Sequence, residues 1–141
     1  MSQENVELVR TAMFPDGVDL VSLPDRDLVR ALDPDALSPE IEVAFATPSG
    51  PVAEYRGLAG FLDGWRDWLM PWASYQVQID EMRDAGERVV ALVTLSGRTS
   101  HDGVEIKQPG AAVFTVSDRK IVRVEFHLDQ REALAAAGLS A

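Results

Sequence analysis

The stretch FLDGWRDWLMPW, residues 61–72, contains all three tryptophans of the chain. Trp65, Trp68 and Trp72 follow one another at intervals of three and four residues, which predicts an amphipathic helix with an aromatic face. From Tyr75 onward, apolar and polar residues alternate, which is the period of a strand with one buried face. The stretch therefore marks the point where the chain changes from helices to strands.

The rest of the chain is also divided into predicted helices and predicted strands. Apolar residues recur at helical spacing over residues 2–13, and a second short helix is predicted to begin at Pro24. Strands separated by turn residues are predicted at residues 41–45, 75–80, 89–95, 111–116 and 121–128. A last helix is predicted to begin at Asp129 and to end near Gly138. Helices followed by hairpin-linked strands predict an α+β fold, with the helices covering one face of a curved antiparallel sheet.

Length and composition indicate one globular domain, residues 1–141, with 46% hydrophobic and 26% charged residues. The formal charge of −10 argues against a nucleic-acid partner and against an anionic membrane surface, because both attract cations. The absence of cysteine excludes a disulfide framework, a thiolate nucleophile and cysteine-bound zinc. The polar N-terminus lacks a signal core, and no run approaches the roughly 20 apolar residues of a membrane span. We therefore expect a cytoplasmic protein without a cofactor, a metal or a membrane partner.

Four segments together resemble the SnoaL-like branch of the nuclear transport factor 2-like superfamily. They are MSQENVELVR at 1–10, YRG at 55–57 leading into GFLDGWRDW, DAGERVVALV at 84–93 and KIVRVEFHLDQREALAAAGL at 120–139. The resemblance implies an α+β cone, with N-terminal helices packed on a strongly curved antiparallel sheet and a short C-terminal helix. It also implies a homodimer formed through the sheet. The family includes isomerases, polyketide cyclases, epoxide hydrolases, dehydratases and non-catalytic binding proteins, so the fold does not select a function.

The catalytic positions that the resemblance implies lack the required residues. The base of ketosteroid isomerases would fall near residues 46–48, which read Ala-Thr-Pro, and none of these can take a proton. The tyrosine of the first helix would fall near Met13 and Phe14. The last acid of epoxide hydrolases would fall near Phe126, and their central strand corresponds to VVALVTLS at 89–96, which has neither acid nor base. The matching positions of this chain therefore lack the residues that catalyse the reactions known for these relatives.

Three other residues are candidates for acid/base chemistry: His127, Glu125 and Tyr55. In the last predicted strand, Val122, Val124, Phe126 and Leu128 share one face, while Ile121, Arg123, Glu125 and His127 share the other. A register slip of one residue would bring Glu125 or His127 into the cavity. Otherwise both lie on the outer face of the sheet or in a dimer interface. Tyr55 precedes the tryptophan helix, where its hydroxyl could reach the mouth of the cavity.

The cavity expected between helices and sheet has apolar walls. The candidate lining residues are Met13, Phe14, Phe45, Trp65, Trp68, Phe114, Val124, Phe126 and Leu128. An apolar cavity with few polar groups suits a small hydrophobic molecule, which is the first hypothesis. The second hypothesis is an isomerase, cyclase or hydrolase that acts on a small polyketide- or steroid-like compound by acid/base chemistry. The third is a structural homodimer whose core is filled by its own side chains.

Overall fold

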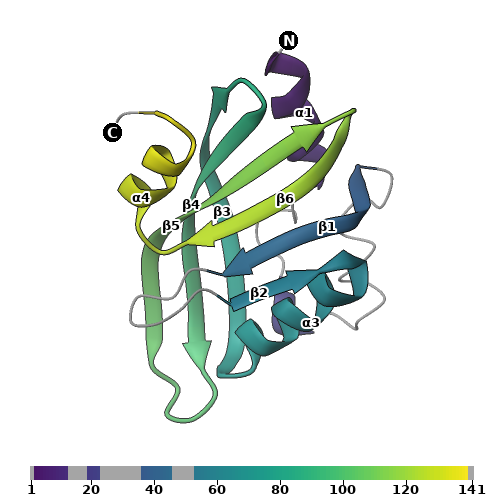
Figure 1. Ribbon diagram of the computed structural model, residues 1–141. Helices are drawn as coiled ribbons and strands as arrows, with labels where there is room; N and C mark the ends of the chain where they lie inside the picture. Colours follow the sequence, from purple (N-terminus) through teal and green to yellow (C-terminus); the bar gives the residue numbers. More distant parts are fainter. Residues whose placement is uncertain (1, 13–18, 23–35, 46–52, 140–141) are drawn as a thin grey trace.

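The computed structural model describes residues 2–12, 19–22, 36–45 and 53–139 (Figure 1). Along the chain, its elements are α1 (Ser2–Ala12), η1 (Leu20–Ser22), β1 (Leu37–Phe45), β2 (Ala53–Arg56), α3 (Gly57–Leu69), β3 (Trp72–Ala85), β4 (Arg88–Thr99), β5 (Glu105–Ser117), β6 (Lys120–His127) and α4 (Gln130–Ala136). The predicted helix that begins at Pro24 lies outside the described residues. The α+β fold class is confirmed.

The six strands of the described residues form one open sheet in the order β2-β1-β6-β5-β4-β3. Four of the five neighbouring pairs are antiparallel, but β1 and β6 run parallel. The sheet is therefore mixed, whereas the sequence predicted an antiparallel one. Parallel neighbours require a long crossover, and here α3 and the meander β3–β5 lie between the two strands.

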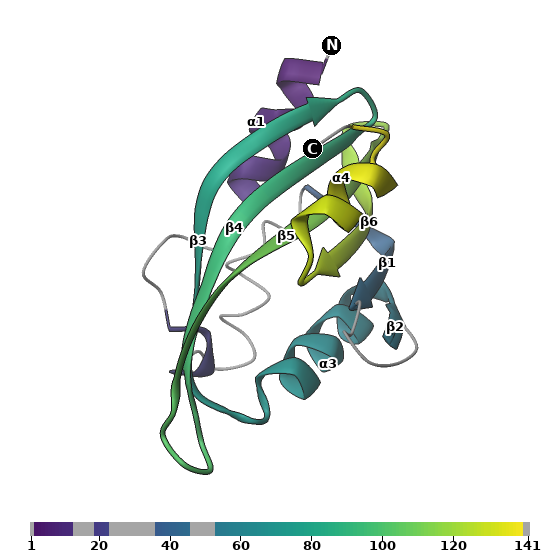
Figure 2. The same ribbon diagram turned by 90° about the vertical axis from the view of Figure 1, so that its left-hand side faces the viewer.

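The sheet bends strongly along β3, β4 and β5 (Figure 2). Register shifts interrupt the β3–β4 pairing between Trp72 and Ser74 and again between Ile79 and Glu81. Such irregularities bend a strand and increase its twist. The candidate site lies between these strands and α3.

A further irregularity in β6 overturns the strict alternation that the sequence predicted. Thr115 pairs with Arg123 and Val116 pairs with Ile121, so Val122 is the extra residue of a bulge. Ile121 is consequently fully buried in the main core together with Val124, although the two residues are three positions apart. Val122 is only half-buried. The predicted assignment of Val122 to the core face and of Ile121 to the opposite face was wrong.

Each face of the central strands is covered by helices (Figure 1). On the inner face, Val6 and Val9 of α1 and Phe61 and Trp65 of α3 belong to the main core. On the outer face, α4 packs on β4 and β5 through a smaller cluster that includes Leu134. Burial on both sides explains why residues 89–93 are continuously buried, as their unbroken apolar run predicts.

The last helix begins and ends as the sequence predicted. Asp129 Oδ1 accepts hydrogen bonds from the backbone N–H groups of Arg131 at 2.8 Å and Glu132 at 3.4 Å, so Asp129 caps the helix. Gly138 follows the helix with a φ of +81°, a conformation that glycine adopts without strain. Within the described part of the chain, no helix is both long enough and apolar enough to span a membrane.

Candidate functional site

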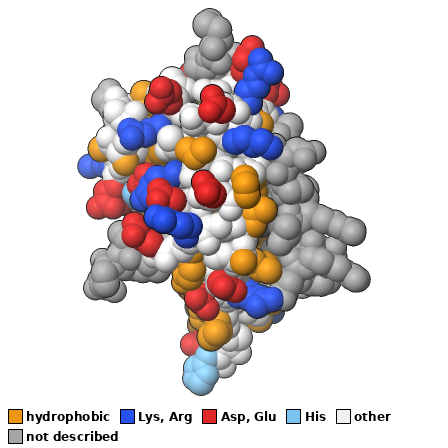
Figure 3. Space-filling model, turned by 45° about the vertical axis from the view of Figure 1, so that its right-hand side comes forward, with side chains coloured by type: hydrophobic (Ala, Val, Ile, Leu, Met, Phe, Trp, Pro, Cys, Tyr) orange, Lys and Arg blue, Asp and Glu red, His pale blue; other side chains and the backbone are white. Residues whose placement is uncertain are grey.

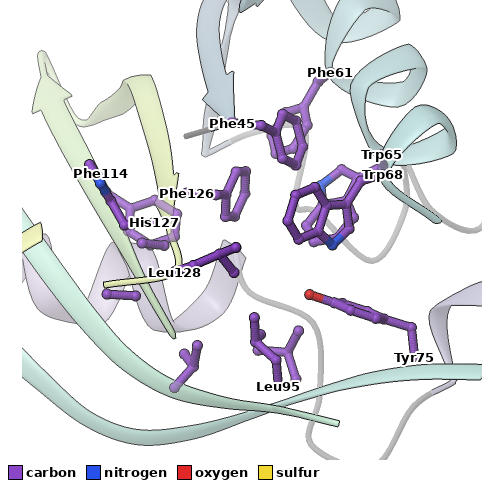
Figure 4. Close-up of a pocket in the computed structure, with 14 residues that line it drawn as sticks. Phe45, Phe61, Trp65, Trp68, Tyr75, Leu95, Phe114, Phe126, His127 and Leu128 are labelled. Atoms are coloured by element: carbon purple, nitrogen blue, oxygen red, sulfur yellow. The ribbon is translucent and has the colours of Figure 1, made fainter. Parts of the chain in front are cut away.

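A cavity of about 50 Å³ lies between α3 and the inner face of the sheet (Figure 4). Its described walls come from α3, the end of β1 and the strands β3 to β6. They consist of Phe45, Phe61, Trp65, Trp68, Tyr75, Val77, Val93, Leu95, Ala111, Ala112, Phe114, Phe126, His127 and Leu128. Apart from Tyr75, His127 and the two indole N–H groups, these side chains are hydrocarbon.

Helical spacing places the aromatic side chains of α3 over the cavity. Phe61, Trp65 and Trp68 lie at intervals of four and three residues and therefore share one face of the helix. Gly64 allows this face to approach the sheet closely. A Cβ atom at Gly64 would lie 2.8 Å from Phe45 Cε1 and 2.9 Å from Tyr55 Cδ1, which is closer than such contacts occur.

The aromatic rings form one continuous cluster. Phe45 stacks on Phe126, with ring centroids 4.8 Å apart, and on Trp68 at 5.5 Å. Trp65 meets Phe126 edge to face at 5.1 Å. Trp65 is 4% exposed, which makes it a core residue with one side on the cavity, whereas Trp68 is half-buried. Such aromatic contacts fix the ring orientations, because edge-to-face and offset-stacked geometries are the favoured ones.

Tyr75 brings a hydroxyl group into the apolar wall, and its side chain points into the cavity (Figure 4). The ring of Trp68 lies edge to face with that of Tyr75, with centroids 6.4 Å apart. Burial raises the pKa of Tyr75 to about 12, and the nearby donor N–H of Trp68 opposes that rise. The hydroxyl is therefore protonated at neutral pH. Sequence reasoning missed Tyr75 as a site residue, although its place in the alternating pattern of β3 put it on the same face as Val77.

The structure places six of the nine predicted lining residues at the cavity: Phe45, Trp65, Trp68, Phe114, Phe126 and Leu128. Val124 is fully buried in the main core but does not line the cavity. Met13 and Phe14 lie outside the described residues. That the six residues bind a ligand stays a prediction.

Tyr55 does not line the cavity. Its ring meets Phe45 edge to face at 5.9 Å, and its hydroxyl donates to Asp67 Oδ2 at 2.9 Å. Burial raises the pKa of Tyr55, and the hydrogen bond to the Asp67 carboxylate raises it further. The hydroxyl is engaged at the surface, away from the position expected for a group that contacts a ligand.

Glu125 belongs to a row of charged side chains on the outer face of β1, β2 and β6. Arg123 lies 3.4 Å from Glu42, 3.4 Å from Glu125 and 3.8 Å from Glu54, so its partners come from its own chain. His127 Nε2 lies 3.5 Å from Glu125 Oε1 at the end of this row, where β6 reaches the edge of the cavity. Glu125 itself is not among the cavity-lining residues.

The surface shows acidic and basic side chains interleaved, without a basic patch on the face seen in Figure 3. Among the described residues, no group of three or more histidine, aspartate or glutamate side chains is placed to hold a metal ion. The site is therefore defined by its aromatic wall, by the Tyr75 hydroxyl and by the imidazole of His127.

The sequence matches the SnoaL-like domain family over residues 25–124, which is more than half of the chain. The chain belongs to this family. No curated protein is significantly similar to it in sequence.

Solved structures show the same fold. A nuclear transport factor 2-like protein of unknown function from Burkholderia pseudomallei K96243 has a TM-score of 0.68 and 20% identity, over 94% of this chain and 95% of that chain. A SnoaL-like protein from Jannaschia sp. CCS1, assigned as a polyketide cyclase, has a TM-score of 0.68 and 17% identity, over 99% and 95%. TerC, co-crystallised with polyporic acid, has a TM-score of 0.68 and 19% identity, over 96% and 98%. At these identities the likeness shows the fold alone.

Proposed function

We propose that the protein binds a small, uncharged and largely apolar molecule in the cavity between α3 and the sheet. The observation that supports this proposal is the composition of the wall, where stacked aromatic rings surround a space reached by one phenol hydroxyl. Ligand sites combine mainly apolar walls with a few placed polar groups in this way. A charged ligand would lose its hydration without gaining an ionic partner, because none of the described lining residues is a lysine, arginine, aspartate or glutamate.

The volume of the cavity limits the size of the ligand. About 50 Å³ is well below the roughly 150 Å³ of an apolar cavity that takes up benzene, and below the roughly 300 Å³ at which drug-sized sites begin. A ring-sized ligand therefore requires wall residues to move outward. Trp68, Leu95 and Leu128 suit this movement because all three are only partly buried.

The catalytic alternative has less support from the geometry. Of its three candidate residues, only His127 lines the cavity, with its Nε2 3.5 Å from Glu125 Oε1, whereas Tyr55 and Glu125 do not line it. The polyporic acid complex of TerC is a property of that protein. At 19% identity it does not identify the ligand of this chain.

A titration with the hydrocarbon α-methylstyrene, followed by protein NMR, tests this proposal. We expect saturable binding, with the largest shifts at residues that line the cavity. Ala112→Val adds two methyl groups to the cavity wall, and we expect it to weaken binding about tenfold through overpacking. Ala91→Val is the matched control, because Ala91 pairs directly with Ala112 and is fully buried in the same core but does not line the cavity.

Unchanged affinity in both variants would mean that the probe binds elsewhere. An absence of binding to the wild-type protein would contradict the proposal. It would favour a core that is closed by its own side chains.

A further inference from the structure

Tyr75 is held firmly at the cavity although its hydroxyl faces into it. The side chain is 2% exposed, and its ring meets Trp72 at 5.1 Å and Trp68 at 6.4 Å, both edge to face. Its backbone is fixed on both sides, because Tyr75 pairs with Gly97 of β4 and its N–H group donates to Asp19 Oδ1 at 3.1 Å. The direction of the hydroxyl is therefore set by the surrounding structure.

The neighbouring indole of Trp68 leaves the hydrogen of this hydroxyl available. A phenol hydroxyl has one donor hydrogen and lone pairs that accept, whereas an indole N–H can only donate. Trp68 therefore cannot accept the hydrogen of the Tyr75 hydroxyl, which is left for another partner. In the described wall, the other side chain with an acceptor atom is His127, whose Nε2 lies beside Glu125.

We propose that Tyr75 donates a hydrogen bond to the ligand of this cavity and that the ligand carries a neutral acceptor oxygen, such as a ketone carbonyl, on an apolar ring. This inference rests on the proposed binding function and adds the chemical class of the ligand. The aromatic wall accepts the ring, and the carbonyl oxygen accepts a hydrogen bond from the Tyr75 hydroxyl. A buried donor that finds no partner is costly, so the site discriminates against a ligand of the same shape that lacks the oxygen.

The protonation state of Tyr75 agrees with a donor role. Because burial raises its pKa to about 12, the hydroxyl carries its proton throughout the physiological range. A carboxylate ligand would meet no lysine or arginine side chain among the described lining residues. A neutral carbonyl satisfies the donor without bringing a charge into the apolar wall.

Two probes of nearly equal shape test the inference. Acetophenone and α-methylstyrene differ in that a carbonyl oxygen replaces a methylene group. We expect wild-type protein to bind acetophenone several-fold more tightly, up to about tenfold, as a single neutral hydrogen bond allows. Tyr75→Phe should remove this preference while still binding α-methylstyrene.

Tyr55→Phe is the matched control, because it removes the other tyrosine hydroxyl of the chain, which bonds to Asp67 outside the cavity wall. It should keep the preference for the ketone. Circular dichroism and thermal unfolding confirm that both variants are folded.

The outcomes separate this inference from the function on which it rests. Equal binding of both probes to the wild-type protein would overturn the donor role of Tyr75 and leave the apolar binding function standing. A ketone preference that persists in Tyr75→Phe would assign the donor to another residue and also overturn the inference. Failure of both probes to bind would overturn the binding function, and the inference with it.

Discussion

The carboxylate of Asp19 ties η1 to the edge strand β3 at Tyr75, the residue that carries the cavity hydroxyl. Asp19 Oδ1 accepts from the backbone N–H of Tyr75 and of Val21, each at 3.1 Å, and Oδ2 accepts from Ser22 Oγ at 2.9 Å. One side chain therefore organises the short η1 helix and occupies a backbone donor of an edge strand, where the sheet offers no partner. Asp19 is thus a positioning residue for Tyr75.

Asp19→Ala should lower the free energy of unfolding by about 2 kcal/mol, because the variant loses hydrogen bonds to a charged acceptor. Asp19→Asn keeps a carbonyl oxygen that can replace Oδ1, so its loss should be smaller. Urea unfolding measures both values. Hydrogen exchange should also show faster exchange of the Tyr75 amide in Asp19→Ala. Equal stability of the wild-type and Asp19→Ala proteins would show that the hydrogen bonds of Asp19 contribute nothing to the free energy of unfolding.

Two glycines of α3 should respond in opposite directions to the same change. Gly64→Ala places a methyl group 2.8 Å from Phe45 Cε1, and we expect a loss of about 1–3 kcal/mol from overpacking, reduced by the better helix propensity of alanine. At Gly60, the added Cβ has ordinary contacts, the nearest being Tyr55 Cβ at 3.4 Å. Gly60→Ala should therefore be neutral or stabilising by up to about 1 kcal/mol. Thermal unfolding measures the stability change in both variants. A stabilised Gly64→Ala protein would contradict the close approach of α3 to β1.

The bulge in β6 makes neighbouring residues unequal. Ile121 is fully buried, so Ile121→Ala should cost about 2–5 kcal/mol. Val122 is half-buried, so Val122→Ala should cost less than about 1 kcal/mol. Chemical denaturation gives both values. A larger loss of stability in Val122→Ala than in Ile121→Ala would contradict the bulge and support the simple alternation that the sequence predicted.

Alkaline pH should weaken the fold through Tyr75. Its pKa is about 12 in the folded protein, against 10.0 for an ordinary tyrosine. Between these values the unfolded chain has released the proton and the folded protein has kept it, so stability falls as pH rises. The slope contributed by this group approaches about 1.4 kcal/mol per pH unit, and below pH 10 it vanishes. Tyr75→Phe should lack this contribution in urea titrations between pH 9 and 12, and identical slopes in the two proteins would refute the burial of the hydroxyl.

Local patterns predicted the elements that depend on neighbouring residues. The spacing of Trp65 and Trp68 predicted α3, but the prediction that Trp72 continues this helix was wrong, because Trp72 is the first residue of β3. The unbroken apolar run predicted a doubly covered β4, and Asp129 predicted the cap of α4. Each of these signals lies within one turn or one strand. The fold class followed from the order of the segments, and the resemblance carried by them agreed with the family match.

Features that depend on long-range pairing could not be read in this way. The parallel pairing of β1 with β6 joins segments about 80 residues apart, and the bulge at Val122 arises from the register with β5. The alternation of apolar and polar residues in β3 was consistent with an inward-facing Tyr75. Only the fold shows that the ring of Trp68 and the carboxylate of Asp19 both contact this residue. The cavity volume depends on how all the aromatic rings pack together, which no local pattern encodes.

A crystal structure of the protein grown with acetophenone would test the central claim most directly. The account predicts electron density for the probe in the cavity, with its ring against Trp68 and Phe126 and its carbonyl oxygen about 2.7–2.8 Å from Tyr75 Oη. It also predicts that Trp68, Leu95 or Leu128 has moved outward to make room. A cavity without the probe at a saturating concentration, with all three side chains in their present positions, would contradict the account and leave the tryptophans as packing residues of a closed core.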